Sequence, residues 1–335
     1  MNKHFEPKKA ARPKPFDAPV PAEEMKRIPG VETKAKRTRA GKIFNLGRNL
    51  HQAVVFADPV HYLDKKSGEW EEIDNTLIPV TDASGNVFLT NRANDELKVE
   101  FHRTTDAAVV LLQDEQDRLL AWRLEDAEDV EPVRVNKPCR EHKDCDLRRD
   151  VLDHLDDEAV FPGIFPGADL HCRIQAMSFK DEIVFANREA VRPVTFVMAM
   201  PNLVPERKED GSIDLIAADG DIAFTLPKPF MKDGDPEKVF GCVAFDLQPT
   251  AERDIWRITY TPDEQWLADA QFPVILDPAV ISKKHSSAME DNYITSMYPS
   301  QVQDYTSGVM RVSQGSGTWG TSKAFLRFLD TGLPW

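Results

Sequence analysis

Two Asp-Gly pairs, Asp210-Gly211 and Asp219-Gly220, constrain the fold of this chain most strongly. An Asp-Gly pair between two short apolar runs is a strong β-hairpin signal, because both residues tolerate the left-handed backbone of a tight turn. Here the pairs separate three such runs, at 203–206, 213–217 and 222–226. Two consecutive β-hairpins are therefore expected in this stretch.

The same alternation of short apolar runs and turn residues continues through most of the chain. Leu97, Val99 and Phe101 alternate with polar residues, as in a strand that buries one face. Residues 109–112 and 119–124 are typical of a further hairpin. About 15 short strands with this spacing predict an all-β fold, with an antiparallel β-sandwich-like first module and short helical excursions.

One short helix is expected late in this module. Thr261-Pro262-Asp263-Glu264 fits a capping box, with Thr261 as the N-cap and Glu264 reaching back to it. Phe272–Leu276 then has the character of a buried strand, which Asp277-Pro278 ends. We interpret residues 266–280 as the seam between two β modules.

Composition divides the chain into three parts. Residues 1–41 form a basic, Pro-rich leader that we expect to be disordered. Residues 42–280 form the β-rich module, with a polar insertion near 125–158. Residues 281–335 begin a second, incomplete jelly-roll-like β-sandwich. This second module stops after 55 residues where a complete sandwich needs roughly 100, so we expect a fragment of a longer chain.

Charge and hydropathy argue against several partners. The formal net charge is −14, but residues 1–42 hold 12 Lys/Arg against 5 Asp/Glu, so the rest of the chain carries −21. This acidic body should repel nucleic acid phosphates and anionic lipid, so no nucleic acid partner is expected. The basic arm could contact an anionic surface such as wall polymer, nucleic acid or lipid, although a solvated leader is the favoured interpretation. No run of about 18 apolar residues is present to span a membrane. The N-terminal stretch also lacks the apolar core of a signal peptide. Taken alone, these features indicate a cytoplasmic protein.

The cysteines offer one candidate metal site. Cys139, His142 and Cys145, with Cys172 further along, supply the thiolates and imidazole that tetrahedral Zn²⁺ prefers. The spacing between Cys139 and Cys145 is wider than usual for zinc, and a disulfide between them is an alternative. Unpaired cysteines are the favoured interpretation. The acidic run that ends at Asp157-Glu158 lacks the ligand order of a calcium loop and is expected to be a solvated face.

The last segment carries two candidate binding sets. Glu290, Asp291 and Asn292 offer three oxygen ligands that would suit a structural Ca²⁺; otherwise no cofactor is expected. Aromatic residues that could stack on sugar rings form the second set: Tyr293, Tyr298, Tyr305 and Trp319. Aromatic residues in short strands belong more often to a core. No catalytic motif is recognisable, so no catalytic residue is assigned and the chain is not expected to be an enzyme.

Several segments together resemble one protein family. They are AVVFADPVHYLDKKSGEWEEIDNTL (53–77), FPGADLHCRI (165–174), LPKPFMKDGDPE (226–237), ITYTPDEQWLADAQFPVILDPAV (258–280), and EDNYITSMYPSQ with SKAFLRF (290–328). These segments are similar to the N-terminal region of bacterial wall-associated Rhs/YD-repeat proteins. The last of them resembles the start of a DNRLRE-type domain, carbohydrate-binding module family 96. The resemblance covers residues 42–335.

The resemblance implies a secreted, extracellular or cell-surface protein with a non-catalytic role. It predicts the N-terminal scaffold of a longer Rhs-like chain with a partial polysaccharide-binding module. The implied partners are a polysaccharide or cell-wall glycan and the downstream repeat region of the same chain. Two alternatives stay open: a structural or assembly cap of a repeat shell without ligand binding, and a polysaccharide-active enzyme.

Overall fold

A computed structural model describes residues 31–47, 50–56, 59–105, 108–135, 154, 156–235, 240–278, 281–282, 289–295 and 322–328. These residues are nearly all β, as predicted, and their strands pair antiparallel. The described helices are short: η1 (Lys34–Lys36), η2 (Arg188–Ala190) and α2 (Glu264–Leu267). None of the helices in the described ranges has the length and apolar character needed to cross a membrane.

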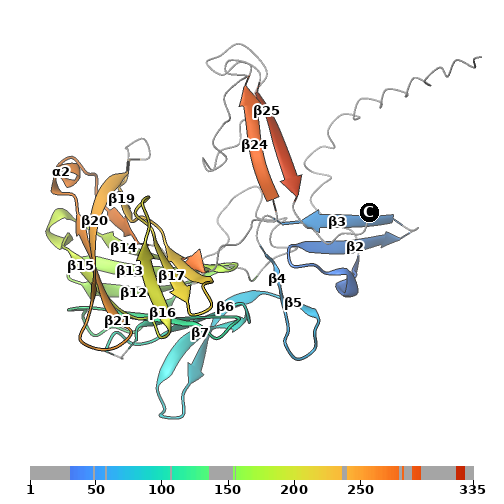
Figure 1. Cartoon of the computed structure of the whole chain (residues 1–335), viewed down its shortest axis with the longest axis horizontal. Helices are drawn as coiled ribbons and strands as arrows, with labels where there is room; N and C mark the ends of the chain where they lie inside the picture. Colours follow the sequence, from blue (N-terminus) through green and yellow to red (C-terminus); the bar gives the residue numbers. More distant parts are fainter. Residues whose placement is uncertain are drawn as a thin grey trace, which may run out of the picture.

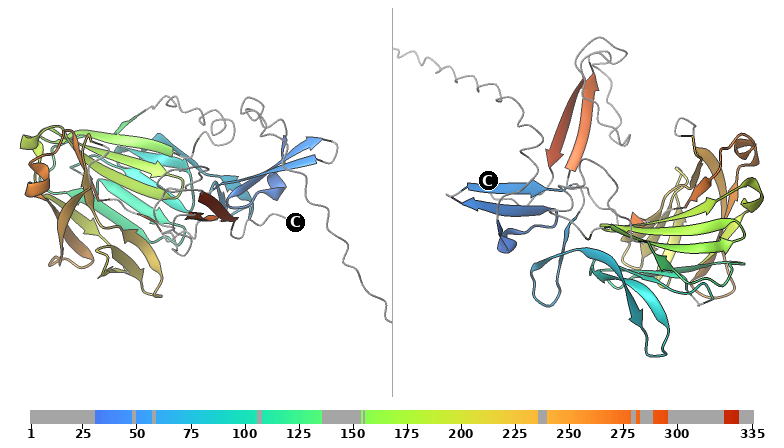
Figure 2. Two further views of the ribbon diagram at one scale, coloured as in Figure 1. Left: turned by 90° about the horizontal axis from the view of Figure 1, so that it is seen from above. Right: turned by 180° about the vertical axis from the view of Figure 1, so that it is seen from behind.

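Fourteen of the described strands form one large sheet. In chain order they are β6 (Asp74–Thr81), β7 (Val87–Ala93), β8 (Leu97–Phe101), β9 (Val110–Asp114), β10 (Leu119–Leu124), β11 (Val133–Arg134), β12 (Asp156–Phe165), β13 (Ala168–Gln175), β14 (Ser178–Phe185), β15 (Val194–Ala199), β19 (Phe230–Lys232), β20 (Gly241–Pro249), β21 (Ile255–Pro262) and β22 (Val274–Asp277). Their order in the sheet is β11-β12-β13-β14-β22-β19-β20-β21-β15-β10-β9-β8-β7-β6. The sheet curls round on itself (Figure 1, Figure 2).

The other described strands form smaller sheets and hairpins. They are β1 (Val31–Glu32), β2 (Gly41–Gly47) and β3 (Leu50–Val55) in one sheet; β4 (His61–Leu63) and β5 (Trp70–Glu72) in a hairpin; β16 (Leu203–Arg207), β17 (Ile213–Ala217), β18 (Ile222–Leu226) and β23 (Ile281–Ser282) in a four-stranded sheet; and β24 (Met289–Thr295) with β25 (Ser322–Phe328).

The strongest local signals of the sequence are confirmed. Along β8, every second residue from Leu97 to Phe101 is buried in the core. β9 and β10 form the expected hairpin. The Asp-Gly pairs form the turns between β16, β17 and β18, where Gly211 and Gly220 have φ angles of 90° and 89°. Glycine adopts such angles without strain because it has no Cβ.

One hydrophobic core lies between the opposing walls of the curled sheet. Trp122 of β10 packs edge-on against Phe179 of β14, with ring centroids 5.3 Å apart. Phe101 of β8 contacts Phe161 of β12 in the same manner, at 6.4 Å. Both contacts join strands that are far apart in the sheet order, so the sheet encloses its own core as a sandwich-like body. Burial of such large rings provides much of the hydrophobic stabilisation.

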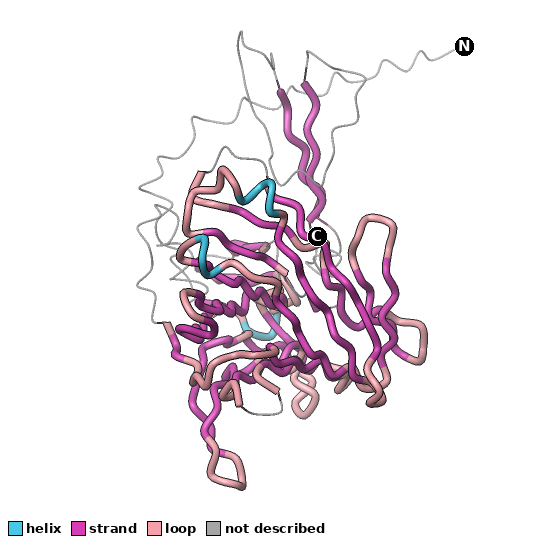
Figure 3. Tube along the Cα trace, turned by 90° about the vertical axis from the view of Figure 1, so that its left-hand side faces the viewer, coloured by secondary structure: helices cyan, strands magenta, loops and turns pink. Residues whose placement is uncertain are grey.

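β6, the strand at one end of the large sheet, contacts β12, which is next to the strand at the other end. Figure 3 shows the described chain from the side, with strands in magenta as nearly all of its regular structure. The backbone N–H of Asn75 donates to the carbonyl oxygen of His154 at 2.7 Å. The backbone N–H of Leu77 donates to the Asp157 carboxylate at 2.8 Å. The buried side chain of Asn75 also donates to the Ala176 carbonyl oxygen. These bonds satisfy backbone groups that a sheet edge would otherwise leave without strand partners.

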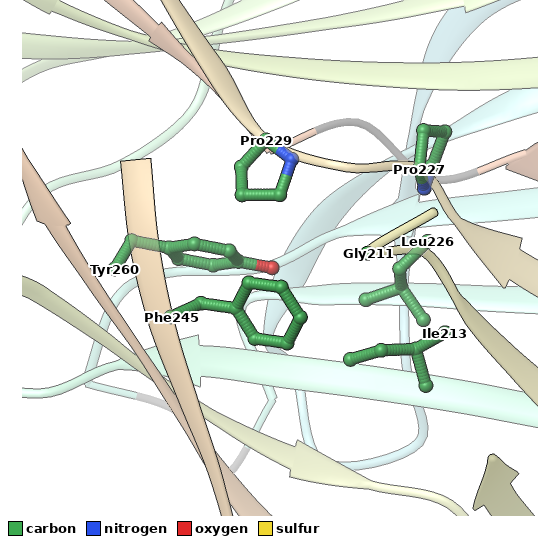
Figure 4. A pocket seen from close by; sticks show the side chains of 7 residues that line it. All are labelled: Gly211, Ile213, Leu226, Pro227, Pro229, Phe245 and Tyr260. Carbon is green, nitrogen blue, oxygen red and sulfur yellow. The ribbon is translucent and has the colours of Figure 1, made fainter. Parts of the chain in front are cut away.

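The four-stranded sheet packs on one part of the large sheet. Ile213 of β17 and Leu226 of β18 lie with Phe245 of β20 and Tyr260 of β21, as Figure 4 shows. The gap between these side chains leaves essentially no room for a water molecule. Burial raises the pKa of the Tyr260 hydroxyl, and the Asp181 carboxylate adds to the effect.

The stretch interpreted as a seam contributes an interior strand to the large sheet. Its strand is β22, which pairs with β14 on one side and β19 on the other. Beyond it, β23 pairs with β18 of the four-stranded sheet. Described structure begins at Val31, inside the predicted leader. Residues 1–30 and much of the insertion near 125–158 lie outside the described residues, and the division of the chain at residue 280 stays a prediction.

Helix α2 begins later than predicted. Its N-cap is Asp263, whose carboxylate accepts hydrogen bonds from the backbone N–H groups of Gln265 at 2.8 Å and Trp266 at 3.2 Å. Thr261 and Pro262 instead belong to β21 and pair with β20. The prediction of Thr261 as the N-cap is wrong, because strand pairing continues through the residues that would start the helix.

Candidate functional site

Most of the residues assigned to binding from the sequence are not tested by the structure. Tyr298, Tyr305 and Trp319 lie outside the described residues. The remaining members of the calcium and aromatic sets lie in β24, whose backbone pairs with β25: Glu290, Asp291, Asn292 and Tyr293. Both residue sets stay predictions.

Cys172 lies in the hydrophobic core. It is fully buried in β13, opposite Asp181 of β14. Burial raises the pKa of its thiol well above the usual value, and the nearby Asp181 carboxylate raises it further. Because zinc binds the thiolate, a thiol held protonated in this way is a poor ligand. Cys139, His142 and Cys145 lie outside the described residues, so the four-residue zinc set stays a prediction.

Three polar side chains meet on the outer face of β12 and β13, and we call them the His171 group: Glu158, His171 and Arg173. Nδ1 of His171 is 3.0 Å from Oε1 of Glu158, and Nη2 of Arg173 is 3.4 Å from Oε2. The Glu158 side chain is 4% exposed, whereas those of His171 and Arg173 are about one-third exposed, at 32% and 33%. An imidazole held by a carboxylate beside a guanidinium can accept a proton and contact an anion.

Sequence reasoning missed the His171 group. Glu158 was expected in a solvated acidic face, and its burial shows that this prediction is wrong for Glu158. The one available signal was the alternation along β13, where apolar residues facing the core alternate with His171 and Arg173. That pattern marks a two-faced strand. It does not reveal that β12 supplies a carboxylate at this position.

Further charges continue across the outer face of β14, β22 and β19. Nζ of Lys180 is 3.0 Å from Glu182 and 2.8 Å from Asp277, and Nζ of Lys232 is 2.6 Å from Glu182. Burial alone would raise the pKa of Glu182, but hydrogen bonds from Lys232 and Lys180 lower it to about 2. Burial raises the pKa of Asp277, and the contact with Lys180 acts in the opposite direction without cancelling the effect of burial.

An open hollow of about 560 Å³ lies over the outer face of β10, β15 and β21. The register places Arg123, Val197 and Arg257 side by side across these three strands. Arg257 forms an ion pair with Glu125, and small side chains such as Ala121 contribute to the floor. The carboxylates of Glu125 and Glu252 also line this hollow, so its two guanidinium groups are balanced by two acidic groups.

Comparison with curated proteins relates the chain to wall-associated proteins and nucleases. The chain is 26% identical over 316 residues to the tRNA3(Ser)-specific nuclease WapA of Bacillus spizizenii. It is 25% identical over 312 residues to the tRNA nuclease WapA of Bacillus subtilis. Each alignment covers 89% of this chain and 13% of the relative.

A shorter relative is matched over most of its own length. A wall-associated protein of Geobacillus stearothermophilus is 22% identical over 237 residues, which are 68% of this chain and 87% of that protein. No protein-family profile matches the chain, and no solved structure matches it. The expected similarity to wall-associated proteins is therefore confirmed. The Rhs/YD-repeat assignment and the DNRLRE-type carbohydrate-binding module gain no support from these relatives.

The relatives correct the functional predictions. A non-catalytic polysaccharide-binding scaffold and the absence of enzyme activity were expected, but three of the relatives are named as tRNA nucleases. The same finding contradicts two predictions about partners: that a polysaccharide is bound, and that nucleic acid is not. The electrostatic argument failed because it used the summed charge of a large region, the acidic body of the chain. Screening limits each charge to a range of about 8–10 Å, so local cations decide whether a site attracts phosphate.

Proposed function

We propose that this chain acts within a wall-associated nuclease that cleaves tRNA. The observation that carries the proposal is the alignment of 89% of the chain with proteins named as tRNA nucleases. Because the chain spans 12% or 13% of those relatives, the activity is proposed for the whole protein that contains it. A cell-surface location is proposed on the similarity to the Geobacillus wall-associated protein.

Within the described residues, the His171 group offers side chains that suit RNA cleavage. A ribose 2′-hydroxyl attacks the adjacent phosphorus once a base removes its proton, and the imidazole of His171, held by Glu158, suits this role. The P–O2′ bond forms, the P–O5′ bond breaks, and the leaving oxygen takes a proton from solvent. The products are a 2′,3′-cyclic phosphate and a 5′-hydroxyl end. Arg173 would stabilise the additional negative charge on the phosphate in the transition state.

The test uses the product of the complete gene, incubated with purified tRNA, followed by mapping of the new RNA ends. His171→Ala is the informative variant. His102→Ala is its matched control, because Nε2 of His102 is 3.2 Å from a glutamate, Glu100, which is paired with Lys98 and not with an arginine. We expect cleavage that is lost by at least a hundredfold in His171→Ala and retained in His102→Ala.

Two other results are informative. Equal cleavage by both variants would assign the reaction to other residues of the protein and leave the nuclease proposal in place. Intact tRNA after prolonged incubation with the complete protein, across several tRNA species and with divalent metal added, would overturn the nuclease proposal itself.

A further inference from the structure

A nearly buried polar cluster lies where the small N-terminal sheet meets the β4–β5 hairpin. Glu32 comes from β1, Lys42 from β2, His61 from β4 and Glu72 from β5, and Arg37 follows η1. The side chains of Arg37 and Lys42 are only 3% and 4% exposed. Charged groups are rarely buried to this degree without a specific arrangement of partners.

His61 is fully buried, and its two ring nitrogens have different surroundings. Nδ1 lies 2.7 Å from the carbonyl oxygen of Thr38. A carbonyl can only accept, so Nδ1 carries the proton and Nε2 carries the lone pair. Nε2 is buried and has no hydrogen-bond partner among the described residues. Metal-binding histidines have this arrangement: one ring N–H donates to a backbone carbonyl, and the lone pair of the other nitrogen has no hydrogen-bond partner.

Two carboxylates lie beside this imidazole. Ligand atoms of Glu32, His61 and Glu72 all fall within 4.8 Å of one another. Ligand atoms around a tetrahedral zinc ion are separated by about 3.4 Å, so an inward movement of little more than 1 Å would bring all three to bonding distance. Burial, with the charges of Arg37 and Lys42 acting in the same direction, lowers the pKa of His61 to about 4.

Lys42 is the group that a metal ion would displace. Its ammonium contacts the Glu72 carboxylate and lies 3.9 Å from Glu32. Arg37 donates to both carboxylates, to Glu32 at 2.7 Å and to Glu72 at 3.0 Å, and it lies 3.7 Å from Glu71. A divalent cation would be balanced by the carboxylates of Glu32 and Glu72, while Arg37 would keep Glu71 as a partner. The flexible stem of lysine lets its ammonium move aside.

We propose that Glu32, His61 and Glu72 form a binding site for a divalent transition metal ion, with Zn²⁺ as the probe, and that Lys42 occupies this site when metal is absent. One imidazole and two carboxylates suit Zn²⁺ better than Ca²⁺ or Mg²⁺, which prefer oxygen ligands alone. The ligands come from β1, β4 and β5, so bound metal would cross-link the N-terminal sheet to the hairpin. This site is independent of the nuclease proposal.

The test is Zn²⁺ binding to metal-stripped protein, measured by titration calorimetry in a buffer without chelators. We expect one equivalent to bind and to raise the thermal midpoint. His61→Ala should weaken binding at least tenfold, and Lys42→Met should tighten it because the competing ammonium is gone. Lys98→Met, which removes an exposed lysine that pairs with Glu100, is the matched control and should leave binding unchanged.

Co²⁺ substitution distinguishes this site from the zinc set predicted around Cys139. A site of one nitrogen and two carboxylate ligands gives visible d–d bands without the intense near-ultraviolet absorption of a cobalt–thiolate bond. Strong thiolate absorption, or Zn²⁺ binding that is equal in His61→Ala, Lys42→Met and the unmodified protein, would overturn the proposal. The Lys42→Met arm keeps the test decisive even if His61→Ala fails to fold.

Discussion

The ring of Phe179 lies 5.3 Å from the ring of Trp122, with the two planes inclined at 75°, although β14 and β10 are not neighbours in the large sheet. Each residue is fully buried and faces the same core from opposite walls. The contact therefore forms only when the large sheet curls so that β10 and β14 face each other across the core.

Replacing Phe179 with alanine should destabilise the protein strongly. The change removes a buried ring and leaves a cavity beneath Trp122, which typically costs about 3–5 kcal/mol of unfolding free energy. Chemical denaturation monitored by far-ultraviolet circular dichroism measures the effect. The matched control is Phe240→Ala, since Phe240 is 60% exposed and should lose less than about 1 kcal/mol. Equal losses for the two variants would contradict the position of Phe179 in a shared core.

The buried carboxyl of Asp181 should make stability depend on pH. Burial, with the charge of Asp277 in second place, raises its pKa from 3.8 to about 7. The folded state thus holds this proton more tightly than the unfolded state. Stability is highest below the unfolded pKa, falls as the pH rises from about 4, and reaches its full loss above about 7.

Asp181→Asn tests this pH dependence because asparagine cannot ionise. As the pH rises from 4 to 8, the unfolding free energy of the variant should increase relative to that of the unmodified protein, by up to about 4 kcal/mol. Near pH 4 the two unfolding free energies should differ little. Unfolding free energies measured at several pH values give the difference curve. Asp246→Asn is the matched control for the substitution itself, because it makes the same change on the exposed side of β20. A flat curve for Asp181→Asn would contradict the raised pKa.

The elements predicted correctly are those that neighbouring residues determine. The Asp-Gly turns and the alternation in β8 act over fewer than about ten residues, so the chain's local pattern contains the information. The order of the large sheet depends on pairings between distant segments. β22, for example, pairs with β14 and β19, and neither pairing has a local signal. Tertiary packing decides these partners.

The polar clusters escaped prediction for the same reason. His171 and Glu158 meet because β12 and β13 pair in one register, which places His171 opposite Val160. His61 and Glu32 meet only because the β4–β5 hairpin approaches the N-terminal sheet. Isolated histidines and glutamates in a sequence rich in charge give no sign of such contacts. The functional predictions relied on a family resemblance and on the lack of a catalytic motif, and neither carries information about these local groups.

The N-cap of α2 can be tested by substitution. The segment Thr261–Asp263 contains two residue types that favour the N-cap position, and the structure selects Asp263. Asp263→Ala should therefore cost about 1 kcal/mol of stability, because two backbone N–H groups lose their acceptor. Thr261→Ala is the control and should cost clearly less, since its side chain caps nothing in α2. Thermal unfolding of both variants measures the difference. A larger loss of stability in Thr261→Ala than in Asp263→Ala would show that Thr261 is the N-cap.

Gly241 should be intolerant of any side chain because the indole of Trp266 lies directly over it. A Cβ built at Gly241 would come within 2.5 Å of the Trp266 ring. Gly241→Ala should therefore displace the indole from β20 and cost about 1–3 kcal/mol of unfolding free energy. Gly234→Ala is the matched control, because its nearest contact would be an ordinary 3.6 Å from Gln271. The double variant Gly241→Ala/Trp266→Ala removes the clash together with the ring. It should be less destabilised than the sum of the two single changes, and simple additivity would show that the two residues do not contact each other.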